Sequence, residues 1–103
     1  KRLRKQKMLE IRQEQQVLVF SGELDRNTVV QFWPFKPLQS LQGNAVFDLA
    51  ALKHVDTAGL AWLIQVLSQA KAKSLQVTLR GMPAQLHSLA AVSDVLSLLP
   101  TES

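Results

Sequence analysis

The residues whose types and spacing suit chemistry lie in one run, from His54 to Leu60. Asp56 and Thr57 stand just before an apolar segment with helical spacing, where a side-chain oxygen can cap the free N–H groups of a helix start. The helix dipole favours negative charge there by about 0.3–1 kcal/mol at an exposed site. Gly59 has no side chain, so another surface can approach the first turn closely. The run fits either an ordinary capped helix or a docking point.

The same run has to be weighed as a catalytic or ligand-binding site. His54 and Asp56 beside Thr57 resemble a nucleophile with its base, but no oxyanion-hole motif or second carboxylate pair accompanies them. Two histidines and no cysteine do not supply a metal site. No glycine-rich phosphate loop is present. We therefore predict no catalytic residue, no metal and no cofactor.

Trp62, in the helix that follows, is a candidate interface anchor. On a helical wheel it lies roughly opposite the apolar stripe formed by Leu60, Leu63, Ile64 and Leu67. The residues near Trp62 on the wheel are small or uncharged: Ala58, Gln65, Val66 and Gln69. An exposed tryptophan in such surroundings is typical of an interface. The alternative is a tryptophan that the preceding helix or the C-terminal segment covers.

Length and composition limit the class of protein. The 103 residues suit one domain with one modest core, and 47% apolar and 19% charged residues are ordinary for a globular protein. No apolar run reaches the ~18 residues that predict a membrane span. The lack of cysteine excludes disulfides and fits a cytosolic protein.

The formal charge of +4 comes from the N-terminus. Five of the twelve basic residues stand in the first seven positions, and without them the charge is −1. This leader could bind the phosphates of lipid or nucleic acid, but terminal charge runs are usually solvated. We predict that residues 1–7 are a disordered or non-native leader and that residues 8–103 form the domain. The domain has no basic face with interleaved aromatics, so we predict no nucleic-acid binding.

The first half of the chain predicts a hairpin and an interrupted helix. Alternation around Leu9 and Ile11 and the apolar run Val17–Phe20 indicate two strands, the second ending at Gly22. Asp25 and Asn27 are candidate N-caps of a helix that begins near Asn27. Pro34 and Pro37 break this helix, and a second short helical piece runs through Leu38 and Leu41. We expect Trp33 and Phe35, on either side of Pro34, to pack in the core; the alternative is a partner-facing ridge.

The second half predicts strands that alternate with helices. The ranges are a strand at Ala45–Leu49, a loop to Asp56, a helix at about Thr57–Lys73, a strand at Gln76–Arg80 and a helix after Pro83. The element order is therefore β-β-α-β-α-β-α. We predict an α/β domain with a four-stranded mixed sheet, in which one edge strand is antiparallel, the rest are parallel, and helices cover the sheet.

Two motifs resemble a known family. Gly22-Glu23-Leu24-Asp25 after a strand, followed by Val55-Asp56-Thr57-Ala58-Gly59-Leu60 at a helix start, is similar to a STAS domain. That family includes anti-sigma-factor antagonists and the domains attached to anion transporters. Ser21, Trp33, Ala61, the strand Val77–Leu79 and Gly81 add similarity to the STAS subunits of phospholipid ABC transporters. The match extends over about residues 9–100 and agrees with the predicted element order.

The resemblance implies a binding subunit without an active site. Its partner would be the cytoplasmic ABC ATPase of a transporter that also contains permease and lipid-binding subunits and maintains outer-membrane lipid asymmetry. The chain would be cytoplasmic and peripheral on the inner membrane, without a span of its own. The partner-binding residues that we predict are His54, Asp56, Thr57, Ala58, Gly59, Ala61, Trp62 and Gln65.

Thr57 corresponds to the residue that sigma-regulating relatives phosphorylate. A phosphate there would add about −1.5 to −2 charges, which a helix start tolerates and a close partner surface does not. The resemblance favours constitutive contact over a phosphorylation switch. Three alternatives stay open: a phospho-switched antagonist of an anti-sigma kinase, a small-ligand or enzymatic α/β domain, and an excised domain of an anion transporter.

Overall fold

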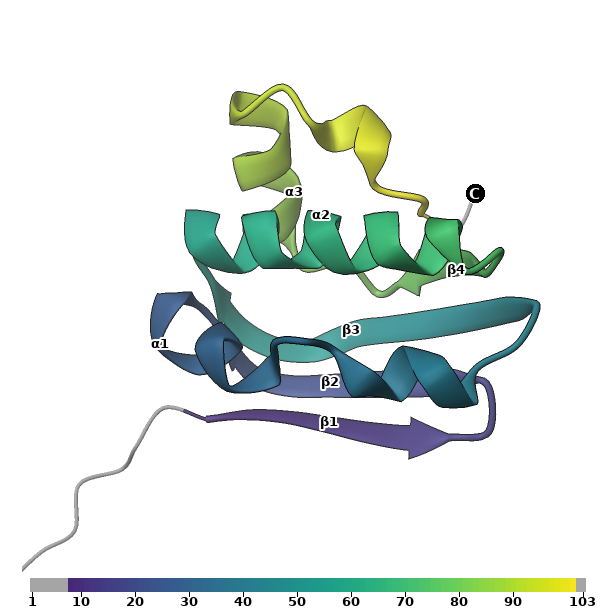
Figure 1. The fold of residues 1–103 in the computed structure, drawn as a ribbon. Coiled ribbons are helices and arrows are strands. Elements are labelled where there is room, and N and C mark those ends of the chain that lie inside the picture. The colour runs from purple at the N-terminus through teal and green to yellow at the C-terminus, as the bar shows by residue number, and fades with distance from the viewer. Residues whose placement is uncertain (1–7, 102–103) are drawn as a thin grey trace, which may run out of the picture.

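A four-stranded sheet with the spatial order β1-β2-β3-β4 organises the molecule (Figure 1). The computed structural model describes residues 8–101, so the predicted leader lies outside the described residues. The strands are β1 (Leu9–Glu14), β2 (Val17–Leu24), β3 (Asn44–Val55) and β4 (Gln76–Arg80). The α-helices are α1 (Arg26–Val29), α2 (Thr57–Ala72) and α3 (Ala84–Val92), and 3₁₀ turns span Val30–Phe32, Lys36–Ser40 and Leu96–Leu98.

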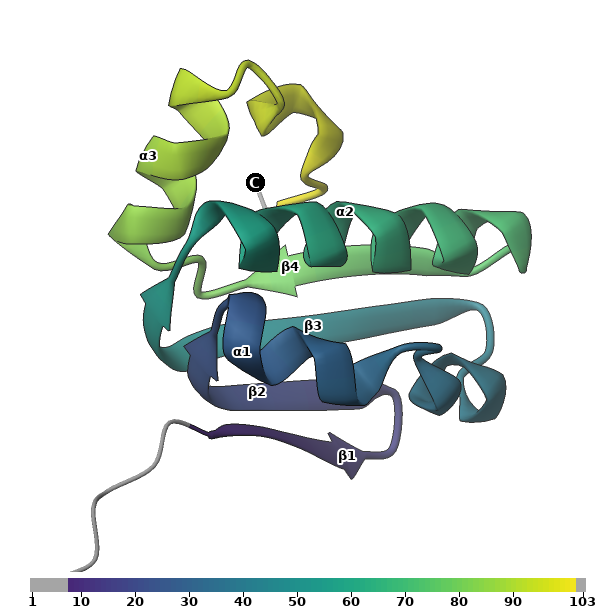
Figure 2. The same ribbon diagram turned by 60° about the vertical axis from the view of Figure 1, so that its left-hand side comes forward.

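The sheet is mixed, as predicted. Strand β1 pairs antiparallel with β2, whereas β2, β3 and β4 are parallel neighbours. Figures 1 and 2 place the helices on one side of this sheet, and the opposite face is open. The predicted element order is confirmed. No helix in the described part of the chain combines the length and apolar character that crossing a bilayer requires.

Strands β2 and β3 extend further than predicted. Strand β2 continues through Gly22 to Leu24, which pairs with Val55 at the end of β3. Gly22 adopts φ +97°, and a Cβ on it would lie 2.2 Å from the carbonyl oxygen of Met8, so only glycine fits inside this strand. The predicted strand end at Gly22 and the predicted loop after Leu49 are therefore wrong. Register shifts between the two strands break the alternation that would have revealed the longer pairing.

The segment between β2 and β3 follows the prediction closely. Asp25 caps α1, because its Oδ1 accepts hydrogen bonds from the N–H groups of Asn27 (2.9 Å) and Thr28 (3.1 Å). The Oγ1 of Thr28 accepts in return from the N–H of Asp25 at 3.0 Å, which completes a capping box. The helical path stops before Pro34 and resumes as the 3₁₀ turn Lys36–Ser40. Asp25 is thus confirmed as the N-cap, and the helix break at Pro34 is confirmed.

The two aromatic residues beside Pro34 differ in environment. Phe35 is buried in the core as expected. Trp33 is 43% exposed, so the expectation that it packs in the core is wrong. The 3₁₀ turn ends at Phe32 and the backbone is extended at Trp33, which carries its side chain out of the helical layer.

The core lies between the sheet and the helices. Strand residues of the covered face, among them Phe20, Phe47 and Leu79, are fully buried. Six residues of helix α2 are buried: Gly59, Leu60, Trp62, Leu63, Val66 and Ala70. Of the predicted stripe, Leu60 and Leu63 are buried, whereas Ile64 and Leu67 are only partly buried. Helix α2 contacts both α1 and α3, so residues on its flanks are covered as well as those that face the sheet.

Candidate functional site

Asp56 caps α2 and ties it to the start of α1. Its Oδ1 accepts from the N–H of Gly59 at 2.8 Å, and its Oδ2 accepts from the N–H of Arg26 at 3.2 Å. Burial raises the pKa of Asp56, but the N–H groups of Gly59, Arg26 and Ala58 and the charge of His54 outweigh it, so the pKa lies below its ordinary 3.8. Both carboxylate oxygens are therefore engaged within the fold, and Asp56 is not arranged as a base for Thr57.

Three of the predicted partner-binding residues form an exposed stripe along α2. Thr57, Ala61 and Gln65 recur every four residues, which places them on one side of a helix, and all three are exposed. We call this set the α2 stripe. It carries no charge and only one long side chain, so it can be covered by another protein with little desolvation of ions.

Gly59 faces the interior and not the surface. A Cβ on this residue would lie 2.0 Å from the carbonyl oxygen of Leu24 at the end of β2. The missing side chain thus lets α2 pack against the backbone of its own domain. The expectation that Gly59 leaves room for a partner surface is wrong, because β2 fills that room.

Trp62 is also buried, at 7% exposure, so the expected exposed anchor is wrong. Its indole meets the ring of Phe35 edge to face, with centroids 5.2 Å apart and an interplanar angle of 83°. The Phe20 ring lies 6.3 Å away at 70°. Trp62 is thus covered, as in the alternative interpretation, but by Phe35 after Pro34 and by Phe20 of β2, and not by the preceding helix or the C-terminal segment.

The exposed tryptophan beside α2 is Trp33, which the sequence analysis assigned to the core. It lines a surface hollow of about 270 Å³ together with Ala61, Trp62 and Gln65. The signal in the sequence was Pro34, since a helix that ends at a proline releases the preceding side chain from the helical pattern. Trp33 therefore extends the α2 stripe toward α1.

A second, smaller hollow borders the stripe on its other side. It measures about 180 Å³ and is lined by Thr57, Leu60, Ala61, Ile64, Ser93 and Val95. Val92, at the end of α3, precedes the lining residue Ser93 in the chain and is 86% exposed. The α2 stripe is thus a low ridge between two hollows, one toward α1 and one toward the C-terminal segment.

The remaining predicted residues lie at the margin of this surface. His54 and Ala58 are half-buried, His54 near the end of β3 and Ala58 in the first turn of α2. Among residues 8–101, no three histidine or acidic side chains gather closely enough to hold a metal ion. The arrangement provides a contact surface of small, apolar and uncharged groups.

Two solved structures of the anti-sigma factor antagonist SpoIIAA share this fold. The unphosphorylated form aligns with a TM-score of 0.66 and 15% identity, over 92% of this chain and 88% of that chain. The phosphorylated form of the Bacillus protein gives 0.62 and 12%, over 92% and 91% of the two chains. At these identities the likeness defines the fold alone.

The family model described as Mlab, STAS domain, matches residues 8–100, and the chain belongs to this family. Curated relatives in Escherichia coli K12 and Shigella flexneri are each 33% identical over 78 residues, or 76% of this chain and 79% of the relative. Both are called intermembrane phospholipid transport system binding protein MlaB. The resemblance to STAS domains inferred from the two sequence motifs is confirmed.

Proposed function

We propose that this chain is the non-catalytic STAS subunit of a phospholipid ABC transporter. In this proposal it docks on the cytoplasmic, MlaF-like ATPase of a complex that also holds permease and lipid-binding subunits, and it supports assembly or activity of the ATPase. It would be cytoplasmic and peripheral on the inner membrane, where the transporter maintains outer-membrane lipid asymmetry. The names of the two curated relatives support the transport system.

The observation that carries the docking proposal is the α2 stripe with Trp33 beside it. Aromatic residues at the centre of a patch, with few charges around them, are typical of stable protein interfaces. Trp33 offers a large side chain that is already partly exposed, and Ala61 leaves the helix surface low enough for a partner to approach it. Two of the residues predicted to bind the partner, Gly59 and Trp62, are buried beneath this surface.

Charged substitutions on the surface test the proposal. Thr57→Glu and Trp33→Asp should each weaken the complex with the ATPase at least tenfold in a titration, because each buries an unpaired charge at the interface. Circular dichroism of the free variants should stay unchanged, since both side chains are exposed. Gln76→Glu is a matched control: it adds one charge at an exposed side chain of β4, away from the α2 stripe, and should bind normally. Normal binding by both test variants would show that the docking surface is elsewhere.

A phosphorylation switch at Thr57 is the second candidate, favoured by one observation. The Thr57 side chain is exposed at the first residue of α2, where kinases can reach it and a helix start stabilises phosphate. Intact-mass analysis after incubation with an anti-sigma kinase would show a gain of one phosphate in the wild type and none in Thr57→Ala. No gain in the wild type would leave constitutive docking as the single proposal.

A further inference from the structure

The indole nitrogen of Trp62 is a buried donor without an acceptor. Among residues 8–101 no hydrogen-bond partner lies within reach of its Nε1, and the atom itself is shielded from solvent. A buried tryptophan N–H usually finds a partner, because leaving it unpaired costs folding free energy. The surrounding rings of Phe20 and Phe35 are apolar and offer at most a weak N–H/π contact.

The unpaired donor belongs to a residue that lines the hollow beside the α2 stripe. The other walls of this hollow are Trp33, Ala61 and Gln65, all exposed side chains. The exposed side chains of Trp33 and Gln65 change rotamer within nanoseconds, so the hollow can adapt when another group enters. None of the four lining residues is charged.

We propose that the docking partner inserts a neutral hydrogen-bond acceptor into this hollow, where it receives the N–H of Trp62. The acceptor is an amide or backbone carbonyl oxygen, because a carboxylate would lose its hydration without gaining a cation. The inference rests on the proposed docking function and adds the chemistry of one contact. In this proposal Trp62 contributes to binding from below the surface, through a ring packed in the core and an N–H that receives its acceptor from the partner.

The decisive experiment removes the N–H group without changing the ring shape. In a Trp33→Phe background Trp62 is the single tryptophan, and a tryptophan auxotroph can replace it with benzothienylalanine, in which sulfur stands for N–H. We expect about tenfold weaker binding to the ATPase than in the same background with tryptophan. The free analogue should melt at the same temperature or higher, because an unpaired donor has been removed.

Two results would overturn the inference and leave the proposed function intact. Equal affinity of the two proteins would mean that the N–H meets no acceptor in the complex. A lower melting temperature of the free analogue would mean that the N–H is already paired within the chain, and Gln65→Ala would then lower it too. Failure of the wild-type chain to bind the ATPase is a distinct result, which removes the proposed function and the inference together.

An NMR measurement reports the same bond directly. The indole proton of Trp62, assigned by its loss in Trp62→Phe, should move downfield when the ATPase is added, as expected for a new hydrogen bond. An unchanged indole shift in a complex that forms with wild-type affinity would contradict the proposal.

Discussion

The two faces of the sheet carry alternate residues of the same strands, and these residues differ in how far they are buried. On the covered face, Phe20, Phe47 and Leu49 are fully buried beneath the helices. On the open face, Val19, Val46 and Asp48 remain half-buried. Because free energy of burial scales with the apolar area removed from water, most of the folding free energy lies on the covered side. The proposed docking surface therefore lies on the helix-covered side of the sheet, where most of the burial is.

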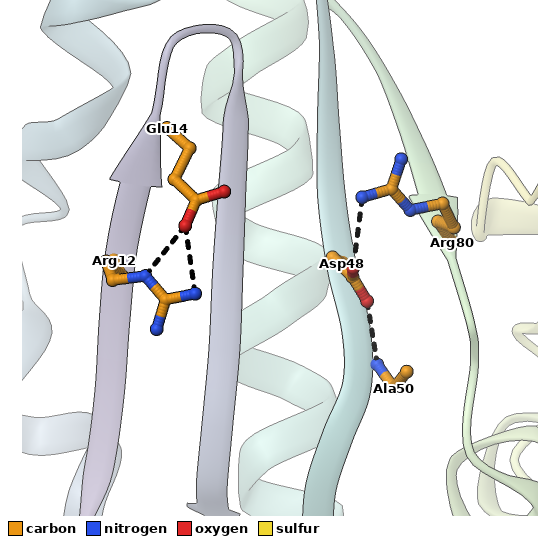
Figure 3. A network of polar contacts seen from close by, with 5 residues as sticks. All are labelled: Arg12, Glu14, Asp48, Ala50 and Arg80. Carbon is orange, nitrogen blue, oxygen red and sulfur yellow. Dashed lines mark hydrogen bonds and ion pairs between the residues drawn. The ribbon is translucent and has the colours of Figure 1, made fainter.

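The open face of the sheet carries ion pairs, whereas the other face is covered by helices (Figure 3). Arg12 and Glu14 pair within β1 at 2.9 Å, and Arg80 of β4 reaches Asp48 of β3 at 3.0 Å. Exposed pairs of this kind contribute about 0.2–1 kcal/mol each. They keep the open face soluble and add little stability, which makes the two faces easy to distinguish by mutation.

The largest effect should come from the covered face of β3. Phe47→Ala should lower the free energy of unfolding by about 3–5 kcal/mol, through lost burial and the cavity left behind. Its neighbour Val46 points to the open face, and Val46→Ala should cost about 1 kcal/mol. Urea denaturation of the two variants measures both values. Similar losses from the two neighbours would break the comparison between the faces.

The next effect concerns a polar group on the helical side. Asp25 is 2% exposed and receives two N–H groups of α1, so Asp25→Ala should cost about 1–2 kcal/mol. Asp25→Asn keeps one acceptor oxygen and serves as the matched control, with a smaller loss in the same denaturation assay. If Asp25→Ala lowered the free energy of unfolding by less than about 0.5 kcal/mol, α1 would not depend on its cap.

A smaller, pH-dependent effect is expected at Asp48 on the open face. The N–H of Ala50 lowers the pKa of Asp48, burial raises it, and Arg80 lowers it further, for a net decrease from 3.8. A carboxyl whose pKa is lower in the folded state adds stability above its unfolded pKa and loses it as pH falls through the folded value. Asp48→Asn should therefore cost up to about 1 kcal/mol at pH 7. The difference in the free energy of unfolding between the two proteins should begin to shrink as the pH falls below 3.8 and should vanish below the folded pKa of Asp48. A difference that does not shrink with falling pH would contradict the assignment.

The smallest effect should come from Arg12. Its pair with Glu14 is largely exposed, so Arg12→Ala should change the free energy of unfolding by no more than about 0.5 kcal/mol. Thermal melts at low and high salt would reveal any contribution, since exposed pairs are screened by ions. A larger, salt-independent loss would mean that the Arg12 stem packs on the open face and would narrow the difference between the two faces.

Local sequence patterns were enough to predict the order of the elements, but they did not predict which side of α2 is buried. Alternation and helical spacing predicted the order of the strands and helices, and the short polar side chain at Asp25 predicted a cap. Pro34 signalled the exposure of Trp33, but the burial of Trp62 was out of reach, because the side on which a helix is covered depends on its neighbours. Here the residues after Pro34 pack Phe35 against Trp62, a contact between segments about thirty residues apart.

Glycine roles show the same limit at the candidate site. The sequence places Gly59 in the first turn of α2 but does not tell which backbone approaches it. The structure brings the carbonyl of Leu24 to that position, so the glycine serves internal packing. The exposed side of this helix was predicted to centre on Trp62, whereas the structure exposes Thr57, Ala61 and Gln65, which recur every four residues.

The carboxylate of Asp56 joins the beginnings of the two segments that carry the proposed docking surface. One oxygen holds the first turn of α2, which carries Thr57, and the other holds the N–H of Arg26, at the start of the segment that leads to Trp33. The two halves of the surface are thus preorganised before any partner arrives. Less conformational entropy is lost on association, so a modest interface of this shape can bind tightly as a rigid body.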